Sequence, residues 1–185
     1  MTGMAPRSFS PFRATRYGAS GDLIDVGALA AVGVRLVLLD RDNTCVPRDT
    51  RVAPPAVREW LGRLRAAGIA TCMLSNNFHS GEVAASACEL GCPVVDHAMK
   101  PAPFSVWVAM ARMGVGPEQT VIVGDQVFTD VLAGNLAGVR TILVRPQSRR
   151  DLWYTQIFRL GEALVLRGVE FEGEASGAAG RGDGC

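Results

Sequence analysis

The stretch V-R-L-V-L-L-D-R-D-N-T, residues 34–44, decides the fold of this chain. It is an apolar run that ends in two acids one residue apart, Asp40 and Asp42. Such a run predicts a central strand of a parallel sheet, which helices cover on both faces. Because ligands bind at the carboxyl ends of these strands, we expect both carboxylates to face a site. A bound cation or a retained proton would relieve their repulsion. For the pair taken alone, a solvated turn is the alternative.

Length and composition predict a single domain that needs no metal or disulfide to fold. The chain has 185 residues and a formal net charge of +1, which gives no basic field for nucleic acid. Its five cysteines form no C-x-x-C pair, and an odd number argues against a closed disulfide framework. We therefore expect a reducing, cytoplasmic setting. No apolar run approaches the length that spans a bilayer, which leaves peripheral membrane contact open.

Helical and apolar stretches alternate along the rest of the core. A short helix is expected at 23–32, before the first strand. We expect further helices near residues 54–68, 81–90, 102–113 and 132–137, and strands near 69–74, 93–95, 120–123 and 141–144. Strands separated by helices predict a parallel sheet built from right-handed crossovers.

Three segments are predicted to lie outside the core, which spans residues 22–150. Residues 1–21 carry arginines and no acid but are broken by prolines, so we expect a flexible arm; a membrane contact or a targeting segment is the alternative. Residues 151–171 predict an amphipathic helix that docks on the sheet, with a partner helix or a membrane surface as alternatives. Its apolar stripe consists of Trp153, Ile157, Leu160 and Leu164. The Gly-rich residues 172–185 are expected to be disordered.

Polar residues follow the later strands in an order that suits phosphoryl transfer. Ser75 follows the second strand, Lys100 the third, and Asp125 and Asp130 the fourth. Because parallel strands end at one edge of the sheet, these side chains should share a crevice with the two acids. A lysine can neutralise the transferred group, a hydroxyl and backbone N–H groups can donate to its oxygens, and carboxylates can hold Mg²⁺. Asn76 either donates to phosphate or shapes the turn.

The motifs D-R-D-N-T at 40–44, Ser75, Lys100 and G-D-Q-V-F-T-D at 124–130 resemble the four motifs of the haloacid dehalogenase (HAD) superfamily of phosphohydrolases. The S-N-N at 75–77 and the G-N-x-A-G pattern at 134–138 narrow the resemblance to the YqeG-like branch of HAD subfamily IIIA, over about residues 20–150. This resemblance implies an α/β, Rossmann-like three-layer sandwich with a parallel central sheet. Mitochondrial phosphatidylglycerophosphate phosphatases are relatives of this branch, which suggests that lipid as a substrate.

The resemblance also implies a role for each residue of the site. Asp40 would be the nucleophile that forms an aspartyl-phosphate, and Asp42 the acid that protonates the leaving oxygen and then the base that activates water. Mg²⁺ would be held by Asp40, the backbone carbonyl of Asp42 and the side chain of Asp125. Asp130 would orient Lys100 or a metal-bound water.

The spacing of these residues leaves no room for an inserted cap domain. Only 35 residues separate Asp40 from Ser75, and 25 separate Ser75 from Lys100. We therefore expect an open site, which suits a macromolecular or lipid-borne phosphate, or a site completed by a neighbouring subunit of a homo-oligomer. One departure from the family is Cys45, which follows Thr44 where leucine is usual. We expect Thr44 to support the site and Cys45 to pack beside it.

Together these observations predict a Mg²⁺-dependent phosphomonoester phosphatase of the cytoplasm or its membrane surface, acting on a phosphorylated small molecule or lipid head group. The alternatives are a phosphatase for soluble sugar, nucleotide or protein phosphates, or a non-catalytic module that binds a phosphorylated ligand or a partner. The presence of Asp42 beside Asp40 favours the enzyme, because a binding module has no need of a second carboxyl that exchanges a proton. His79 and His97 are expected at the surface, although either could line the crevice.

Overall fold

Six parallel strands form one sheet at the centre of the protein. The computed structural model describes residues 11–77, 79–148, 166 and 169–173. The strands lie in the order β1-β6-β5-β2-β3-β4, so the strand that ends in the acidic pair, β2, is internal. Their bounds are β1 Arg16–Gly18, β2 Leu36–Asp40, β3 Ala70–Leu74, β4 Val94–Val95, β5 Thr120–Gly124 and β6 Arg140–Val144. The prediction of an α/β fold around a parallel sheet is confirmed.

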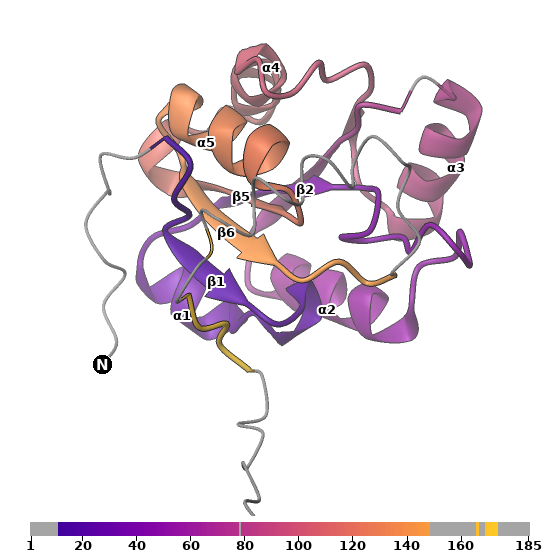
Figure 1. Cartoon of the computed structure of the whole chain (residues 1–185), viewed down its shortest axis with the longest axis horizontal. Coiled ribbons are helices and arrows are strands. Elements are labelled where there is room, and N and C mark those ends of the chain that lie inside the picture. The colour runs from indigo at the N-terminus through magenta and orange to yellow at the C-terminus, as the bar shows by residue number, and fades with distance from the viewer. Residues whose placement is uncertain (1–10, 78, 149–165, 167–168, 174–185) are drawn as a thin grey trace, which may run out of the picture.

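Helices cover both faces of the sheet, which gives three layers (Figure 1). α1 and α2 pack on one face, and α4 and α5 pack on the other. The helices are α1 Val26–Ala31, α2 Pro55–Ala66, α3 Ser80–Leu90, α4 Phe104–Met113 and α5 Leu132–Ala137. Shorter turns are the 3₁₀ segments η1 Gly21–Leu23 and η2 Pro117–Gln119, and the π-helical turn η3 Val127–Val131. Each predicted core helix and strand therefore has a counterpart in the structure.

The sequence of β2 is apolar without interruption up to Asp40 because both faces of the strand are buried. Val37 and Leu39 pack with the helices of one face, whereas Leu36 and Leu38 pack with those of the other. All four are fully buried. Successive side chains of a strand alternate between faces, so a strand covered on both sides has no position for a polar residue until it ends. Asp40 is that end, and the alternation directs it toward the face of Leu36 and Leu38.

Helix α2 begins and ends where its sequence predicts. Pro55 occupies the first turn, where the missing N–H costs nothing, and Gly68 follows the helix with a φ of +73°. The apolar residues at helical spacing form its buried face: Val57, Trp60, Leu61 and Leu64. The indole N–H of Trp60 donates to the carbonyl of Ile24 at 3.0 Å. Trp60 therefore belongs to the core, with its one polar group paired.

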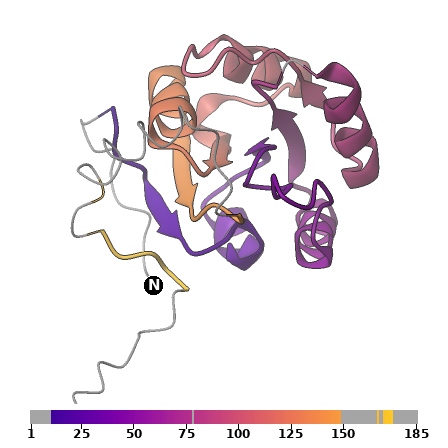
Figure 2. The same ribbon diagram turned by 45° about the vertical axis from the view of Figure 1, so that its right-hand side comes forward.

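The N-terminal part of the chain corrects the prediction of a flexible arm over residues 1–21. Residues 16–18 form β1 at the edge of the sheet, where they pair with β6 (Figure 2). Further hydrogen bonds fix this segment, including one from the Thr15 N–H to the Thr141 carbonyl at 2.9 Å. No strand pattern is visible in the sequence here because β1 has only three residues, Arg-Tyr-Gly, and each is half-buried. Residues 1–10 lie outside the described part.

The C-terminal predictions are tested only at a few positions. The apolar stripe expected within residues 151–171, Trp153, Ile157, Leu160 and Leu164, lies outside the described residues. Phe171 is buried with Ala14 and Leu143, and the Glu172 N–H donates to the Tyr17 carbonyl at 2.9 Å. The predicted boundary of a disordered tail at residue 172 is therefore too early, because Glu172 belongs to the fold.

No cap domain interrupts the described core. Between β2 and β3 the chain forms one loop and α2, and between β3 and β4 it forms α3. This confirms the expectation drawn from the spacing of the motifs. Within the described ranges no helix is both long and apolar enough to cross a membrane.

Candidate active site

Charged side chains from three segments meet at the carboxyl end of the central strands. Asp40 is the last residue of β2, Lys100 follows β4, and Asp130 lies in the π-helical turn after β5. The ammonium Nζ of Lys100 donates to Asp40 Oδ1 at 2.5 Å, to Asp130 Oδ1 at 2.6 Å and to the Leu74 carbonyl at 3.3 Å. All three charged groups are buried. The structure thus brings together residues that lie far apart in the sequence, as predicted.

A third buried carboxylate completes an oxygen-rich site beside this lysine. Asp125 follows the end of β5, and one oxygen from each of Asp40, Asp125 and Asp130 lies within 4.8 Å of the others. Three carboxylates around one ammonium carry a formal charge of −2, and carboxylate oxygens are the ligands that Mg²⁺ prefers. The donor set therefore fits a divalent cation. Both oxygens of Asp130 already accept hydrogen bonds, from Lys100 and from the Gln126 N–H.

Burial and neighbouring charges shift the pKa of two members of this cluster. Removal from water is the largest cause that raises the pKa of Asp40 from 3.8 to about 7; the Lys100 ammonium opposes this rise, and the carboxylates of Asp130 and Asp42 add to it. Burial lowers the pKa of Lys100, but the carboxylates of Asp130 and Asp40 raise it by more. The pKa of the lysine is therefore raised. Lys100 is therefore a permanent cation, whereas Asp40 can hold a proton when no metal is present.

Gly124 allows Asp130 to reach Lys100. A Cβ at this last position of β5 would lie 2.3 Å from the carboxyl carbon of Asp130, well inside van der Waals contact. The carboxylate therefore occupies the space that any other residue at position 124 would fill. Glycine is required here by close approach and not by an unusual backbone conformation.

Asp42 lies apart from the buried cluster and has its own partner. Its side chain is 23% exposed, and Oδ1 accepts a hydrogen bond from Arg41 Nη1 at 2.6 Å. Arg41 is buried and also donates from Nε to Ser86 Oγ at 3.1 Å, which anchors it to α3. Arg41 was not among the residues predicted for the site. The signal available was its place between the two acids, where a third charge is unusual at the end of a buried strand.

Ser75 and Asn76 follow β3, and their side chains have different hydrogen-bond partners. The Ser75 hydroxyl oxygen accepts the N–H of Asn77 at 3.1 Å, so its proton points elsewhere and is available as a donor. The carboxamide of Asn76 forms two hydrogen bonds of 2.9 Å with the backbone N–H and carbonyl of Lys100. The Asn76 side chain therefore fixes the backbone of the lysine, and its role in phosphate binding stays a prediction.

The loop after β2 is held by Asn43 and Thr44. Asn43 adopts a φ of +62°, which asparagine tolerates better than most residues, and its N–H donates to the Val46 carbonyl at 2.9 Å. The Thr44 carbonyl accepts Gln147 Nε2 at 2.7 Å. The buried Thr44 hydroxyl has no hydrogen-bond partner among the described residues. Thr44 thus supports the loop through its backbone.

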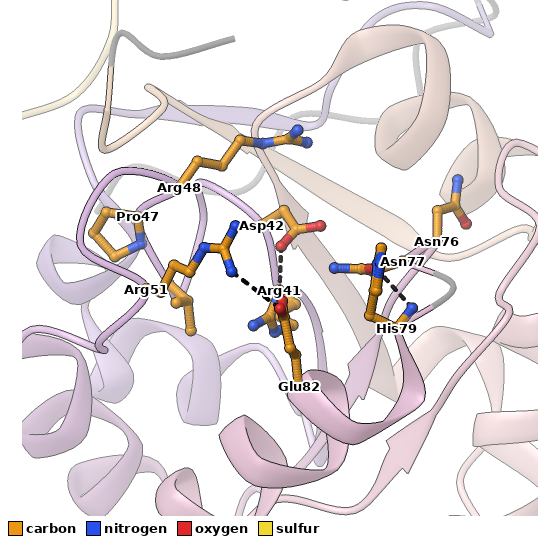
Figure 3. Close-up of a pocket in the computed structure, with 10 residues that line it drawn as sticks. Arg41, Asp42, Pro47, Arg48, Arg51, Asn76, Asn77, His79 and Glu82 are labelled. Atoms are coloured by element: carbon orange, nitrogen blue, oxygen red, sulfur yellow. Dashed lines mark hydrogen bonds and ion pairs between the residues drawn. The ribbon is translucent and has the colours of Figure 1, made fainter. Parts of the chain in front are cut away.

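An open pocket of about 480 Å³ adjoins this loop (Figure 3). Asp42 and Asn76 are the two predicted site residues that line it, whereas the others of the site, Asp40, Ser75, Lys100, Asp125 and Asp130, are buried and are not part of the lining. Its lining consists of Arg41, Asp42, Val46, Pro47, Arg48, Arg51, Asn76, Asn77, His79 and Glu82.

The two histidines differ in their relation to this pocket. His79 is exposed and lines it, with Nδ1 3.0 Å from Asn77 Oδ1. His97 is exposed beside Asp96 and is not part of the lining.

Known proteins with similar sequences are phosphatases by name. The chain is 34% identical over 140 residues to the probable phosphatase YqeG of Bacillus subtilis, which covers 76% of this chain and 81% of that protein. It is 32% identical over 158 residues to the chloroplastic phosphatidylglycerophosphate phosphatase 1 of Chlamydomonas reinhardtii, covering 80% of this chain but 59% of that relative.

A family model and a solved structure agree with these relatives. Residues 97–156 match the HAD-hydrolase-like family. The fold is similar to that of the cobalt-bound deoxy-D-mannose-octulosonate 8-phosphate phosphatase of Haemophilus influenzae, with a TM-score of 0.50 and 16% identity over 72% of this chain and 88% of that one. At this identity the likeness concerns the fold alone.

Proposed function

The chain belongs to the YqeG-like phosphatases of the HAD family, and from this premise we propose that it hydrolyses phosphate monoesters through a phosphorylated Asp40. The observation that carries the proposal is the position of Asp40. Its carboxylate lies at the end of β2, 2.5 Å from the ammonium of Lys100 and beside two further buried carboxylates. A nucleophilic carboxylate next to a fixed cation suits attack on an anionic phosphoryl group.

The first step forms the Asp40–phosphorus bond and breaks the bond to the alcohol oxygen. Asp40 attacks as the ionised carboxylate, and Lys100 and the Ser75 hydroxyl stabilise the charge that develops on the phosphoryl oxygens. The carboxyl of Asp42 gives its proton to the leaving oxygen. The proposed role of Asp42 is supported by its position in the lining of the open pocket, where the alcohol would lie and which Asp40 does not line.

The second step returns Asp40 to its free form. Asp42, now ionised, takes a proton from water, and the hydroxide formed attacks the phosphorus of the aspartyl-phosphate. Asp130 holds Lys100 in place through both steps by its 2.6 Å ion pair. Asp40 thus forms the covalent bond, and Asp42 transfers the proton.

We assign Mg²⁺ to the carboxylates of Asp40 and Asp125, together with the backbone carbonyl of Asp42. Both oxygens of Asp130 already accept hydrogen bonds, which favours Asp40 and Asp125 as the carboxylate ligands. The ion would neutralise the carboxylate pair and the phosphate, and it would keep Asp40 ionised despite the raised pKa of this residue.

Phosphatidylglycerophosphate is the substrate that we propose first. The relatives include proteins named for this activity, and the site has no cap domain that would enclose a small molecule. A head group could enter the open pocket while its acyl chains stay in a membrane, which would require only peripheral contact. A soluble phosphate ester is the alternative substrate.

Phosphate release from the purified protein tests this proposal. The substrates are p-nitrophenyl phosphate, soluble sugar and nucleotide phosphates, and phosphatidylglycerophosphate in detergent, each with Mg²⁺ or with EDTA. We expect release only with the metal, a preference for the lipid, and loss of activity to background in Asp40→Asn. Asp96→Asn is the matched control, because Asp96 follows β4 at the same edge of the sheet but is about half exposed. Activity retained in Asp40→Asn would refute the covalent mechanism.

A further inference from the structure

The pocket beside Asp42 is larger than one phosphoryl group, and three of the residues that line it are arginines. Its volume of about 480 Å³ falls in the range of pockets that enclose a whole small molecule. The cluster that would stabilise the transferred group, centred on Lys100, is buried and is not part of the pocket lining. The pocket is therefore where the alcohol half of the substrate would lie, and its side chains should report what that half contains.

One of the three arginines that line the pocket has no acidic partner among the residues that the structure describes. Arg41 pairs with Asp42 at 2.6 Å, and Arg51 pairs with Glu82 at 3.0 Å. Arg48 forms no ion pair with any described residue. Its Nε is buried and lacks a hydrogen-bond partner in the described part of the chain. A buried donor without a partner is destabilising, and a bound anion would offset this cost.

The position of Arg48 is fixed relative to Asp42. Its backbone N–H donates to Asn43 Oδ1 at 3.2 Å, and the same oxygen accepts the Ser148 hydroxyl at 2.8 Å. Asp42 and Val46 form a β-bridge in this loop. Figure 3 shows the Arg48 side chain extending from the loop toward the side of the pocket that Asn76 lines. Arg48 and Asp42 thus line the same pocket, in which the leaving group would lie.

We infer that this pocket is a subsite for a second anionic group, and that Arg48 is its specificity-determining residue. The inference rests on the proposed function and narrows its substrate class. The substrate would be a phosphate monoester whose alcohol carries another phosphate, as a monoester or a diester. A guanidinium matches two phosphate oxygens at once, which lysine does not. The head group of a lipid and a soluble bisphosphate share this chemistry.

Three substrates separate the contribution of the second anion from that of acyl chains. p-Nitrophenyl phosphate has no second anion, glycerophosphorylglycerol phosphate has a diester but no chains, and dioctanoyl phosphatidylglycerophosphate has both. In Arg48→Gln we expect kcat/KM for both diester substrates to fall at least tenfold more than for p-nitrophenyl phosphate. Arg48→Lys should restore part of the difference, since it keeps the charge but not the two-pronged geometry. Arg58→Gln is the control, because Arg58 is an exposed arginine that pairs with Glu89 outside the pocket.

Equal losses for all three substrates would overturn the inference, because Arg48 would then act on the transferred phosphate. A loss confined to the lipid would also overturn it, since it would indicate contact with a membrane or detergent surface. No loss for any substrate would do the same.

A binding measurement keeps this subsite distinct from the proposed reaction. Glycerophosphorylglycerol carries the diester without the monoester, so calorimetry with it reports on the subsite alone. We expect binding that weakens with salt and falls at least tenfold in Arg48→Gln. If no substrate were hydrolysed but this binding persisted, the proposed function would fail and the subsite would stand. Absence of binding to the wild-type protein would refute the subsite whatever the activity.

Discussion

Asp40→Asn should change the stability of the metal-free protein in a way that depends on pH. Burial is the main reason that the pKa of Asp40 rises from 3.8 to about 7, against the attraction of Lys100. Asparagine has nearly the same shape as the protonated carboxyl and cannot ionise. The variant therefore resembles the wild-type protein at acidic pH and lacks the buried anion that the wild-type protein acquires at neutral pH.

The size of the effect follows from the difference between the folded and unfolded pKa. Between about pH 4 and about pH 7 the unfolded chain has lost the Asp40 proton and the folded protein has kept it, so the free energy of unfolding of the wild type falls by about 1.4 kcal/mol per pH unit. Above the folded pKa the loss is complete, at about 4 kcal/mol in total. The variant has no such loss. The stability of Asp40→Asn minus that of wild type should therefore rise with pH, by about 2.5 kcal/mol between about pH 5 and about pH 8.

Urea unfolding in EDTA, followed by circular dichroism across this pH range, measures the difference. Asp96→Asn should show no comparable trend because Asp96 is about half exposed. Mg²⁺ should then reduce this difference at neutral pH: it stabilises the wild type, by about 2.7 kcal/mol at a hundred times its Kd, and stabilises the variant less. A difference that stays constant with pH, or that falls as pH rises, would refute the idea that Asp40 is a buried carboxyl with a raised pKa.

Two other substitutions test how the lysine and its partner are positioned. In Gly124→Ala the new Cβ would lie 2.3 Å from the Asp130 carboxyl carbon, so we expect a loss of stability of about 1–3 kcal/mol and a clear fall in kcat. Thermal melts and phosphate release measure both, and Gly116→Ala, where no atom lies within 4 Å, should change neither; similar behaviour of the two variants would contradict the steric reasoning. Asn76→Ala removes two hydrogen bonds to the Lys100 backbone, so kcat for p-nitrophenyl phosphate should fall by about tenfold with a smaller change in KM. An unchanged kcat would mean that the ion pairs of Lys100 suffice to hold it.

The core elements could be predicted from the sequence because their signals are local. β2 is buried on both faces, so its apolar run has no polar interruption before Asp40. α2 has a proline in its first turn, a glycine after its end and one apolar face. β1 could not be predicted in this way. Its three residues are half-buried and contain no apolar run, and it becomes a strand only through its hydrogen bonds to β6.

The sequence predicted which residues form the site more fully than it predicted how they are hydrogen-bonded. That Asp40, Lys100 and Asp130 meet follows from strand ends sharing one edge of a parallel sheet. The hydrogen bonds between the Asn76 carboxamide and the Lys100 backbone could not be predicted in this way. An asparagine after a strand is equally typical of a simple turn. Nor did the sequence indicate that Arg48 would face the pocket without an acidic partner.

By itself the sequence determined which segments are strands and helices, that no cap domain is inserted, and which polar residues stand at the strand ends. These properties depend on the period of apolar residues and on chain length, which are set over a few neighbouring residues. The tertiary structure alone decided how the polar groups pair: Lys100 with Asp40 across 60 positions, Arg41 with Ser86 across 45, and Asn76 with Lys100 across 24. Such pairs depend on where loops and packed helices place side chains in space, and no local period of the chain encodes those positions.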